Sequence, residues 1–549
     1  MRQTLSAPCG MATAPHHLAS ASAAAVLREG GNAIEAMVAA AATIAVVYPH
    51  MNSIGGDGFW LISEPGRPPL AIDACGRAAA AATLDFYAGR GCTRAIPGRG
   101  PLAALTVAGA VSGWQEALQH SQRLGGRLPL SRLLEDAIRY ARDGAPVTRS
   151  QVDFTTRFLP ELGGLPGFAG QFLEPGVGPA AGKAGNAAVP RADTLRRYPA
   201  LALSLQTLAR QGLDDFYRGE LAAAIADEHA RLGGPLALAD LQAHRARTVA
   251  PLQVALQGGA TLYNMTPPTQ GLASLMILAI FDRLRQRHAI TEVDSLPYLH
   301  AMVEATKQAF RVRNRHIADP DTMAARGASP ARFLGEDFIG QCADAVDMER
   351  ALPWPEPAIH GDTIWMGTAD HHGRMVSYIQ SVYWEFGSGV VLSDTGIVWQ
   401  NRGSSFQLDA RSHLALAPRK QPFHTLNPAH ARFADGRHMV YGNMGGDGQP
   451  QTQSAVFSRY ALYGQSLQQA VTAPRWLLGK TWGQESTTLK FERRFDPAVL
   501  DGLRRRGHDV ELLDEFSDTM GHAGAIVRQP DGLLLGAADP RSDGAVAGY

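Results

Sequence analysis

Small apolar residues dominate positions 16–50, and a pair of glycines divides this segment into two stretches. Gly30 and Gly31 are typical of a helix end, and Asn32 is a good N-cap for a second helix. The second stretch, within "AIEAMVAAAATIAVVYPH", is almost wholly small and apolar, which predicts a helix packed against several neighbours. The next run, "MNSIGGDGFWLIS", places a glycine turn before a buried strand from Phe59 to Ile62.

Helical spacing continues through the middle of the chain, where Leu and Ala recur every three or four residues over 102–250. "SRLLEDAIRYARDG" predicts an amphipathic helix that ends in glycine. "LPYLHAMVEATKQAFRVRNRHIADP" predicts a longer helix that stops at Pro320. Residues 345–360 are polar and rich in proline, which predicts an exposed segment without regular structure.

The pattern changes after Thr363, where short alternating strands with glycine turns dominate. Examples are "TIWMGTAD", "RMVSYIQSV" and "HARFADGRHMVYGN". One long helix is expected to interrupt them, around "QTQSAVFSRYALYGQSLQQAVTAP". Helices and strands are both abundant without strict alternation, and this predicts a layered α+β architecture.

Composition narrows the possible functions. Lys plus Arg equals Asp plus Glu, at 51 each, so the chain lacks the excess of basic residues that would indicate a nucleic-acid partner. The four cysteines fit no zinc or redox spacing, and neither a signal-peptide core nor an apolar run of membrane-spanning length is seen. These features predict a cytoplasmic protein that has no membrane partner.

The junction Gly361-Asp362-Thr363 lies between the proline-rich segment and the first of these strands. Thr363 is either an ordinary β-branched strand residue or the nucleophile of a self-cleavage at Asp362–Thr363. Attack of its hydroxyl on the preceding carbonyl, followed by hydrolysis of the ester, would leave Thr363 as a new N-terminus. Its α-amine would have a pKa of about 7.7–8.0, so one residue would supply both nucleophile and base.

A second glycine pair, Gly445-Gly446 in "VYGNMGGDGQPQ", lies between a predicted strand and a predicted helix. Backbone N–H groups exposed there could hold an oxyanion. An ordinary turn explains the spacing equally well. A phosphate loop of the Walker type is not indicated, because the Lys-Ser/Thr pair is absent.

The segments around Thr363 and Gly445-Gly446 resemble the γ-glutamyltransferase family of N-terminal nucleophile hydrolases. The same resemblance extends to "GGNAIEAMVAAAATIAVVYPHMNSIGGDGFWLI", "PRKQPFHTLNP" and the terminal "GAADPRSDGAVAGY". The resemblance implies a four-layer αββα sandwich made as one precursor. It also implies cleavage into a large subunit, residues 1–362, and a small subunit, residues 363–549, that form one intertwined domain. No cofactor and no metal are expected.

The resemblance assigns the catalytic roles residue by residue. The family's nucleophile falls on Thr363, and the family's second threonine, which hydrogen-bonds the nucleophile, falls on Ser381. The oxyanion glycines fall on Gly445 and Gly446. The acyl-transfer machinery is therefore expected to be complete.

The residues that recognise glutamate in the family differ here. The arginine that holds the substrate α-carboxylate is replaced by Cys75, with Arg77 two residues away as a conceivable substitute, and the family's Ser-Ser pair becomes His424-Thr425. The positions that receive the α-amino group read Tyr383, Arg402 and Ser405.

Arg402 would repel a substrate ammonium and bind a carboxylate, so the expected substrate is a small acid amide without an α-amine. The alternative is that Arg402 points outward and Tyr383 only fills space. The segment between Asn401 and Pro422 also looks short for a lid over the site, which would favour hydrolysis over transfer.

The motifs "IQSVY", "PFHTLNP" and "MGGDGQPQ" resemble the branch of the family that includes oxamate amidohydrolase and cephalosporin acylases. Hydrolysis of oxamate to oxalate and ammonia is the favoured hypothesis. A glutathione-acting γ-glutamyl hydrolase or transferase, a glutaryl-cephalosporin-type acylase, and an uncut, inactive binding protein are the alternatives. The oligomeric state is left open.

Histidines provide the remaining candidates. The pairs His16-His17 and His371-His372 have no carboxylate or cysteine at ligand spacing, so surface or turn positions are favoured over a metal site. His522 precedes a predicted strand and either lines the pocket or has a structural role.

Overall fold

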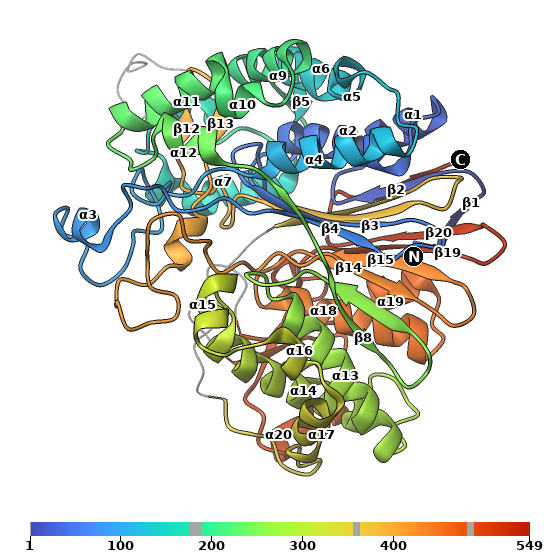
Figure 1. Cartoon of the computed structure of the whole chain (residues 1–549). Helices are drawn as coiled ribbons and strands as arrows, with labels where there is room; N and C mark the ends of the chain where they lie inside the picture. Colours follow the sequence, from blue (N-terminus) through green and yellow to red (C-terminus); the bar gives the residue numbers. More distant parts are fainter. Residues whose placement is uncertain (1, 175–187, 355–362, 480–487) are drawn as a thin grey trace.

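Two seven-stranded sheets lie face to face in the computed structural model, with helices on both outer faces (Figure 1). The structure describes residues 2–174, 188–354, 363–479 and 488–549. Every neighbouring pair of strands within these two sheets is antiparallel. The predicted four-layer αββα sandwich is confirmed.

The first sheet combines strands from both ends of the chain with strands from its middle. In spatial order it contains β1 (Leu5–Ala7), β20 (Leu534–Ala538), β19 (Ala523–Arg528), β15 (His438–Asn443), β14 (Ala429–Arg432), β9 (Thr261–Asn264) and β8 (Leu252–Ala255). The second sheet contains β21 (Ala545–Gly548), β2 (Met11–Ala14), β10 (Ile364–Ala369), β11 (Met375–Ser381), β3 (Asp57–Ser63), β4 (Leu70–Ala74) and β7 (Arg247–Val249).

Strand β10 begins directly after Thr363 and lies between β2 and β11 in the second sheet. Strands from before and after Thr363 are therefore neighbours within one sheet. The short strands outside the two main sheets are β5 (Ala145–Pro146) with β6 (Leu195–Arg196), β12 (Val391–Leu392) with β13 (Ile397–Val398), and β16 (Trp476–Leu478) with β17 (Leu489–Glu492) and β18 (Val510–Leu513).

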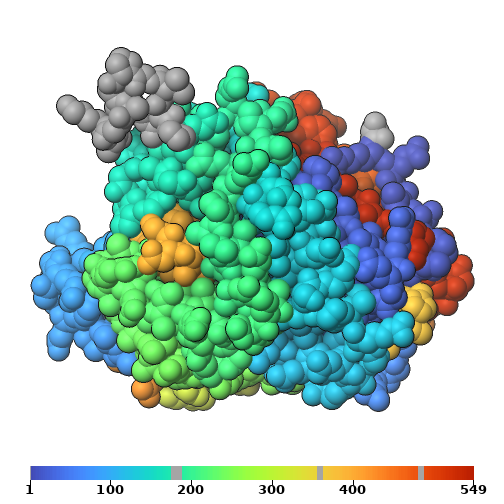
Figure 2. Space-filling model, turned by 90° about the horizontal axis from the view of Figure 1, so that it is seen from above, coloured from blue at the N-terminus to red at the C-terminus, as the bar shows by residue number. Residues whose placement is uncertain are grey.

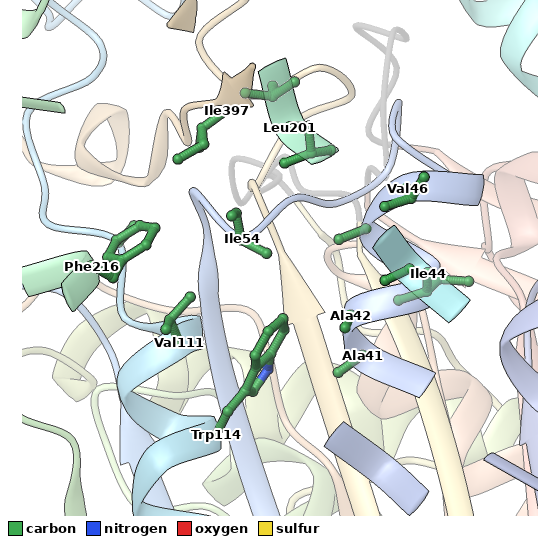
Figure 3. Close-up of a cluster of buried hydrophobic side chains, with 14 of the residues drawn as sticks. Ala41, Ala42, Ile44, Val46, Ile54, Val111, Trp114, Leu201, Phe216 and Ile397 are labelled. Carbon is green, nitrogen blue, oxygen red and sulfur yellow. The ribbon is translucent and has the colours of Figure 1, made fainter. Parts of the chain in front are cut away.

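Helices α1 (His17–Arg28), α2 (Ala33–Val47) and α4 (Ala110–Arg123) cover the second sheet. Asn32 and Glu35 form a capping box that starts α2, and every residue of α2 is buried. Its small side chains, such as Ala41 and Ala42, belong to the same hydrophobic cluster as Trp114 of the neighbouring helix α4 (Figure 3). The predicted close packing of this helix is confirmed, and Figure 2 shows the outer surface of the same helical layer.

Helices α13 (Gly271–Arg287), α14 (Leu296–His316), α18 (Gly448–Phe457) and α19 (Leu467–Thr472) lie on the side of the first sheet (Figure 1). The single long helix expected around 451–474 is wrong. Helix α18 passes into a π-helical turn, Ser458–Leu462, and Gly464 then adopts a positive φ of 70°. Ser466 caps the separate helix α19, so glycine conformation and a polar cap divide the apolar pattern.

The other helices are shorter on average and connect or cover the two layers. They are α3 (Leu84–Ala88), α5 (Leu130–Leu133), α6 (Glu135–Asp143), α7 (Arg149–Leu162), α8 (Phe168–Phe172), α9 (Pro199–Gln211), α10 (Asp215–Arg218), α11 (Glu220–Arg231), α12 (Leu238–Ala243), α15 (Pro320–Ala325), α16 (Pro330–Phe333), α17 (Glu336–Asp344) and α20 (Pro497–Arg505). Within the described residues, no helix has the length and apolar character needed to cross a membrane.

Trp365 of β10 lies between the two sheets, and glycines make room for its ring. A Cβ atom at Gly442 would lie 2.1 Å from Trp365 Cδ1, and one at Gly524 would lie 2.6 Å from Cζ3. The indole N–H donates to Ser377 Oγ at 2.9 Å. The strand that follows Thr363 is thus held firmly between both sheets.

The proline-rich segment before Thr363 agrees with the prediction in its described part. Residues 345–354 contain no helix or strand, and all but Ala351 are exposed or half-buried. Ala351 nevertheless attaches the segment to the protein, because its N–H donates to the Arg506 carbonyl at 2.7 Å. Residues 355–360 lie outside the described residues.

Candidate active site

Thr363 is completely buried and lies directly before the first residue of β10. Gln449 of α18 donates a hydrogen bond from Nε2 to Thr363 Oγ1 at 3.3 Å. Gln449 is itself oriented by Asn427, whose Nδ2 donates to Gln449 Oε1 at 3.1 Å. The hydroxyl at the predicted cleavage point therefore belongs to an ordered polar network, while Asp362 lies outside the described residues.

Ser381 lies beside Thr363 on the neighbouring strand. Ile364 pairs with Gln380 in the β10–β11 ladder, so the next positions along the ladder, Thr363 and Ser381, are opposite each other. Ser381 Oγ accepts a hydrogen bond from the Tyr383 N–H at 2.7 Å. Tyr383 has a φ of 84°, an uncommon conformation for a bulky residue and one that clusters at functional sites.

Gly445 and Gly446 form the turn between β15 and α18, with φ values of 108° and 40°. Glycine is required at the first of these positions because side chains rarely tolerate such a φ. Among the described residues, neither glycine N–H donates a hydrogen bond. Two donors near the start of a buried helix are thus available to a developing negative charge.

Gln270 connects this turn to the segment that carries His424 and Thr425. Its Nε2 donates to the carbonyls of Thr425 and Gly446, both at 2.8 Å. Its Oε1 accepts from Arg313 Nη1 at 2.9 Å, and the same nitrogen contacts Asp447 Oδ1 at 2.6 Å. All these side chains are buried, so the two loops are held in a fixed relative position.

Arg402 is fully buried, so the alternative in which it points outward is wrong. Its guanidinium carbon lies 3.6 Å from the centre of the Tyr383 ring, and Nη2 donates to Thr425 Oγ1 at 3.2 Å. Nε and Nη1 have no hydrogen-bond partner in the described part of the chain. Burial lowers the pKa of Arg402 to about 10, so it stays cationic near neutral pH.

Asp57 and His424 lie beside Arg402. Asp57 Oδ2 accepts from His424 Nε2 at 3.0 Å, and both side chains have no exposed surface. Burial raises the pKa of Asp57 to about 7, even though the Gly76 N–H and Arg402 oppose this rise. Burial and then the Arg402 charge hold the pKa of His424 well below its usual value.

Of the other residues expected at or near the glutamate-recognition positions, Cys75 lies in the Arg402 cluster, whereas Arg77 and Ser405 bond to backbone carbonyls. Cys75 is buried near Asp57 and Arg402, and burial raises the pKa of its thiol well above the ordinary value. Arg77 donates instead to the Arg419 carbonyl at 2.9 Å and lines another cavity, so it does not replace the missing arginine. Ser405 donates to the Phe423 carbonyl at 3.2 Å.

Sequence reasoning missed Asp57, Gln270, Asn427 and Gln449. Asn427 and Gln449 are polar residues inside the quoted motifs "PFHTLNP" and "MGGDGQPQ", which was the available signal. Asp57 was treated only as part of a glycine turn. Its contact with His424 spans 367 positions of sequence, and spacing does not reveal such a pair.

The histidine pairs are not brought together with metal-ligand partners in the described residues. His16 caps α1 by accepting from the Leu18 N–H, and the rings of His371 and His372 lie 3.8 Å apart. His522 is buried before β19, and its carbonyl accepts from Met444 N at 3.1 Å, directly before the glycine turn. This contact supports a structural role.

Elsewhere in the part of the chain that the structure describes, two groups of potential ligands exist, Asp57–Cys75–His424 and His300–Glu304–His508. Their chemistry does not suit a resident cation. Asp57 Oδ1 already accepts from Gly76, Gly109 and Gln400, and Arg402 adds a positive charge. In the second group, the ammonium of Lys307 lies 2.7 Å from Glu304 Oε1.

The gamma-glutamyltranspeptidase family model matches residues 19–549. The chain belongs to this family. Its members hydrolyse or transfer amides, and the chain is accordingly an N-terminal nucleophile hydrolase acting on amide bonds.

Relatives within the family differ in substrate. An oxamate amidohydrolase proenzyme from Klebsiella pneumoniae is 58% identical over 541 residues, covering 98% of each chain. A glutathione hydrolase proenzyme from Escherichia coli is 29% identical over 552 residues, covering 95% of this chain and 89% of that one. The crystal structure of a cephalosporin acylase from Bacillus halodurans superposes with a TM-score of 0.87 at 31% identity, covering 100% of this chain and 97% of the other.

Proposed function

We propose that this family member hydrolyses the amide of a small carboxylate-bearing substrate, with oxamate as the best candidate. The observation that carries the proposal is the buried guanidinium of Arg402, whose Nε and Nη1 donors have no partner among the described residues. A planar guanidinium with two such donors fits a carboxylate and repels an ammonium. The 58% identity to the Klebsiella pneumoniae oxamate amidohydrolase supports the same substrate.

The nucleophile in this proposal is Thr363, released by cleavage of the Asp362–Thr363 bond into subunits of residues 1–362 and 363–549. Relatives described as proenzymes support this processing. The new α-amine takes the proton of the Thr363 hydroxyl, whose oxygen then attacks the amide carbon. Ser381 orients that hydroxyl from the adjacent strand.

Gly445 and Gly446 stabilise the oxyanion of the tetrahedral intermediate. Its collapse breaks the C–N bond, the amine returns the proton to the leaving nitrogen, and ammonia departs. Water then hydrolyses the ester, so oxamate and water give oxalate and ammonia. Arg402 and Thr425 hold the substrate carboxylate, with His424 and Tyr383 forming adjacent walls.

Product assays on purified enzyme test the proposal. Ammonia release from oxamate should far exceed glutamate release from glutathione, and Thr363→Ala should abolish both chain cleavage and turnover. A denaturing gel reports the cleavage separately. Preferential glutamate release would favour a glutathione hydrolase, while one full-length band with no turnover would favour an inactive binding protein.

A further inference from the structure

The carboxylate of Asp57 has a full set of hydrogen-bond donors. Oδ1 accepts from the Gly76 N–H at 2.9 Å, the Gly109 N–H at 3.0 Å and Gln400 Nε2 at 3.1 Å. Oδ2 accepts from His424 Nε2 at 3.0 Å. Four donors around a buried carboxylate stabilise its ionised form against the cost of burial.

The contact with Asp57 determines the tautomer of His424. With its proton on Nε2, the neutral imidazole has a lone pair on Nδ1. That nitrogen is buried and has no hydrogen-bond partner within the described residues. The next residue, Thr425, contacts Arg402, and the guanidinium charge acts on the imidazole, so the two groups are neighbours.

At pH 8, above the raised pKa of Asp57 of about 7, the charges around this pair sum to zero when no substrate is bound. Asp57 contributes the negative charge and Arg402 the positive one. The other titratable groups that face Asp57 are neutral near pH 7, because burial raises the pKa of each. They are Cys75, Tyr217 and Tyr378.

The charged groups that lie farther from Asp57 have partners of their own. Asp73, which faces Cys75, accepts from Arg247 at 3.0 Å and from Gln421 at 3.0 Å. Arg77, which also faces Cys75, donates to the Arg419 carbonyl. Tyr383, on the other side of Arg402, remains protonated because burial raises its pKa.

A carboxylate bound to Arg402 disturbs this balance in two ways. It leaves two buried negative charges with one positive charge, which is costly where water is excluded. It also brings its own lone pairs toward the lone pair of His424 Nδ1. One added proton removes both problems, because it restores neutrality and converts Nδ1 from an acceptor into a donor.

We propose that the Asp57–His424 pair takes up a proton when a carboxylate binds to Arg402, so that the pocket accepts its anionic substrate together with that proton. The pair acts as a specificity-determining element, and the inference rests on the proposed function because it requires Arg402 to hold the carboxylate. The proton comes from solvent and returns to it when the product leaves. A neutral amide would gain nothing from the pair.

Isothermal titration of the processed enzyme with pyruvate tests this coupling. Pyruvate is a monoanion with a carboxylate next to a carbonyl, and it contains no amide to cleave. Titrations at pH 8 in phosphate and in Tris separate the heat of binding from the heat of buffer ionisation. We expect uptake of about one proton, and a Kd that rises about tenfold per pH unit above the apparent pKa of the pair.

Variants identify the group that is protonated. His424→Gln keeps an N–H donor toward Asp57 and leaves the Asp57 carboxyl as the titratable member of the pair, so uptake falls to about zero where the imidazole receives the proton and persists where Asp57 does. Asp57→Asn should also abolish uptake, because it removes the negative charge. His229→Gln, which alters another buried histidine beside Trp399, should leave uptake unchanged.

Undiminished uptake in His424→Gln and Asp57→Asn would overturn the inference and would point to another group, such as the Thr363 amine. Uptake of no proton by the wild type, with binding still abolished in Arg402→Gln, would overturn it while leaving the proposed function intact. Absence of pyruvate binding between pH 6 and 9, together with full turnover in Arg402→Gln, would overturn both.

Discussion

Replacement of Arg402 by glutamine is the most direct perturbation of substrate recognition. The side chain is fully buried, and its Nε and Nη1 donors are available for two parallel hydrogen bonds to a carboxylate. Hydrogen bonds to charged groups contribute about 1.5–3 kcal/mol each, so two lost bonds correspond to about 3–6 kcal/mol. At about 1.4 kcal/mol per tenfold change, kcat/KM for oxamate should fall by about a hundredfold to ten-thousandfold.

The assay is ammonia release at several oxamate concentrations, with the extent of chain cleavage measured on a denaturing gel. Arg402→Gln should still be cleaved, because scission at Asp362–Thr363 uses the Thr363 hydroxyl rather than the guanidinium. Arg402→Lys keeps the charge but loses the fork, and its kcat/KM should be intermediate.

Arg77→Gln is the matched control, since Arg77 is close in sequence to the pocket but contacts the Arg419 carbonyl instead. Its kcat/KM should stay within about twofold of the wild type, as for surface substitutions away from special features. Equal losses in Arg77→Gln and Arg402→Gln would refute the assignment of the carboxylate to Arg402. So would loss of cleavage in parallel with loss of turnover.

Other predictions test the supports of the site and of the fold. Gln270→Leu removes two hydrogen bonds, to the Thr425 and Gly446 carbonyls, at about 0.5–1.5 kcal/mol each, while Asn427 and the Gln449 N–H still donate to these carbonyls; kcat should fall about tenfold, and Gln270→Asn should retain more activity. Asp539→Asn should lower the urea-unfolding free energy at pH 7 by about 3–5 kcal/mol, because it breaks a buried ion pair with Arg475 and Arg541. Burial raises the pKa of Asp539, but these arginines outweigh it and lower the pKa to about 2. The contribution of Asp539 to stability is therefore present above the unfolded pKa of about 3.9 and disappears as pH falls through about 2. An unchanged difference in unfolding free energy between variant and wild type at pH 2 would contradict this. Gly442→Ala should cost about 1–3 kcal/mol in the same unfolding assay because its Cβ would lie 2.1 Å from Trp365, whereas Gly258→Ala, with open space around it, should cost far less.

Much of the fold was predictable where local signals and tertiary packing agree. The Asn32 N-cap and the apolar composition of α2 predicted where the helix begins and that it is buried, and the long helical pattern of α14 predicted a helix that ends before Pro320. The layer order did not follow from periodicity and came from the family resemblance. The break between α18 and α19 was missed because Gly464 lies inside an otherwise continuous helical pattern.

The site residues likewise divide into those that the sequence predicted and those that only the structure revealed. Thr363, Ser381, Gly445 and Gly446 lie in short motifs at strand ends. Their local sequence left two interpretations open for Thr363 and for the glycine pair, and the resemblance assigned the catalytic ones and added Ser381. Binding of a carboxylate by Arg402 was inferred from its position in the family pattern, but its burial and its stacking on Tyr383 needed the structure. The Asp57–His424 contact joins the start of β3 to a loop far along the chain, and only the folded sheet brings these residues together.

Placement of Thr363 within the sheet explains how a protein could cut its own chain at a buried site without losing that site. Strand β10, after the junction, pairs with β2 from before it, and β11 pairs with β3 in the same way. Asp57 at the start of β3 and His424 after the junction also belong to opposite sides of the proposed cut. Because these ladders and contacts cross between the two products, scission of one peptide bond would release an amine while the sheet, the glycine turn and the carboxylate pocket keep each other in place.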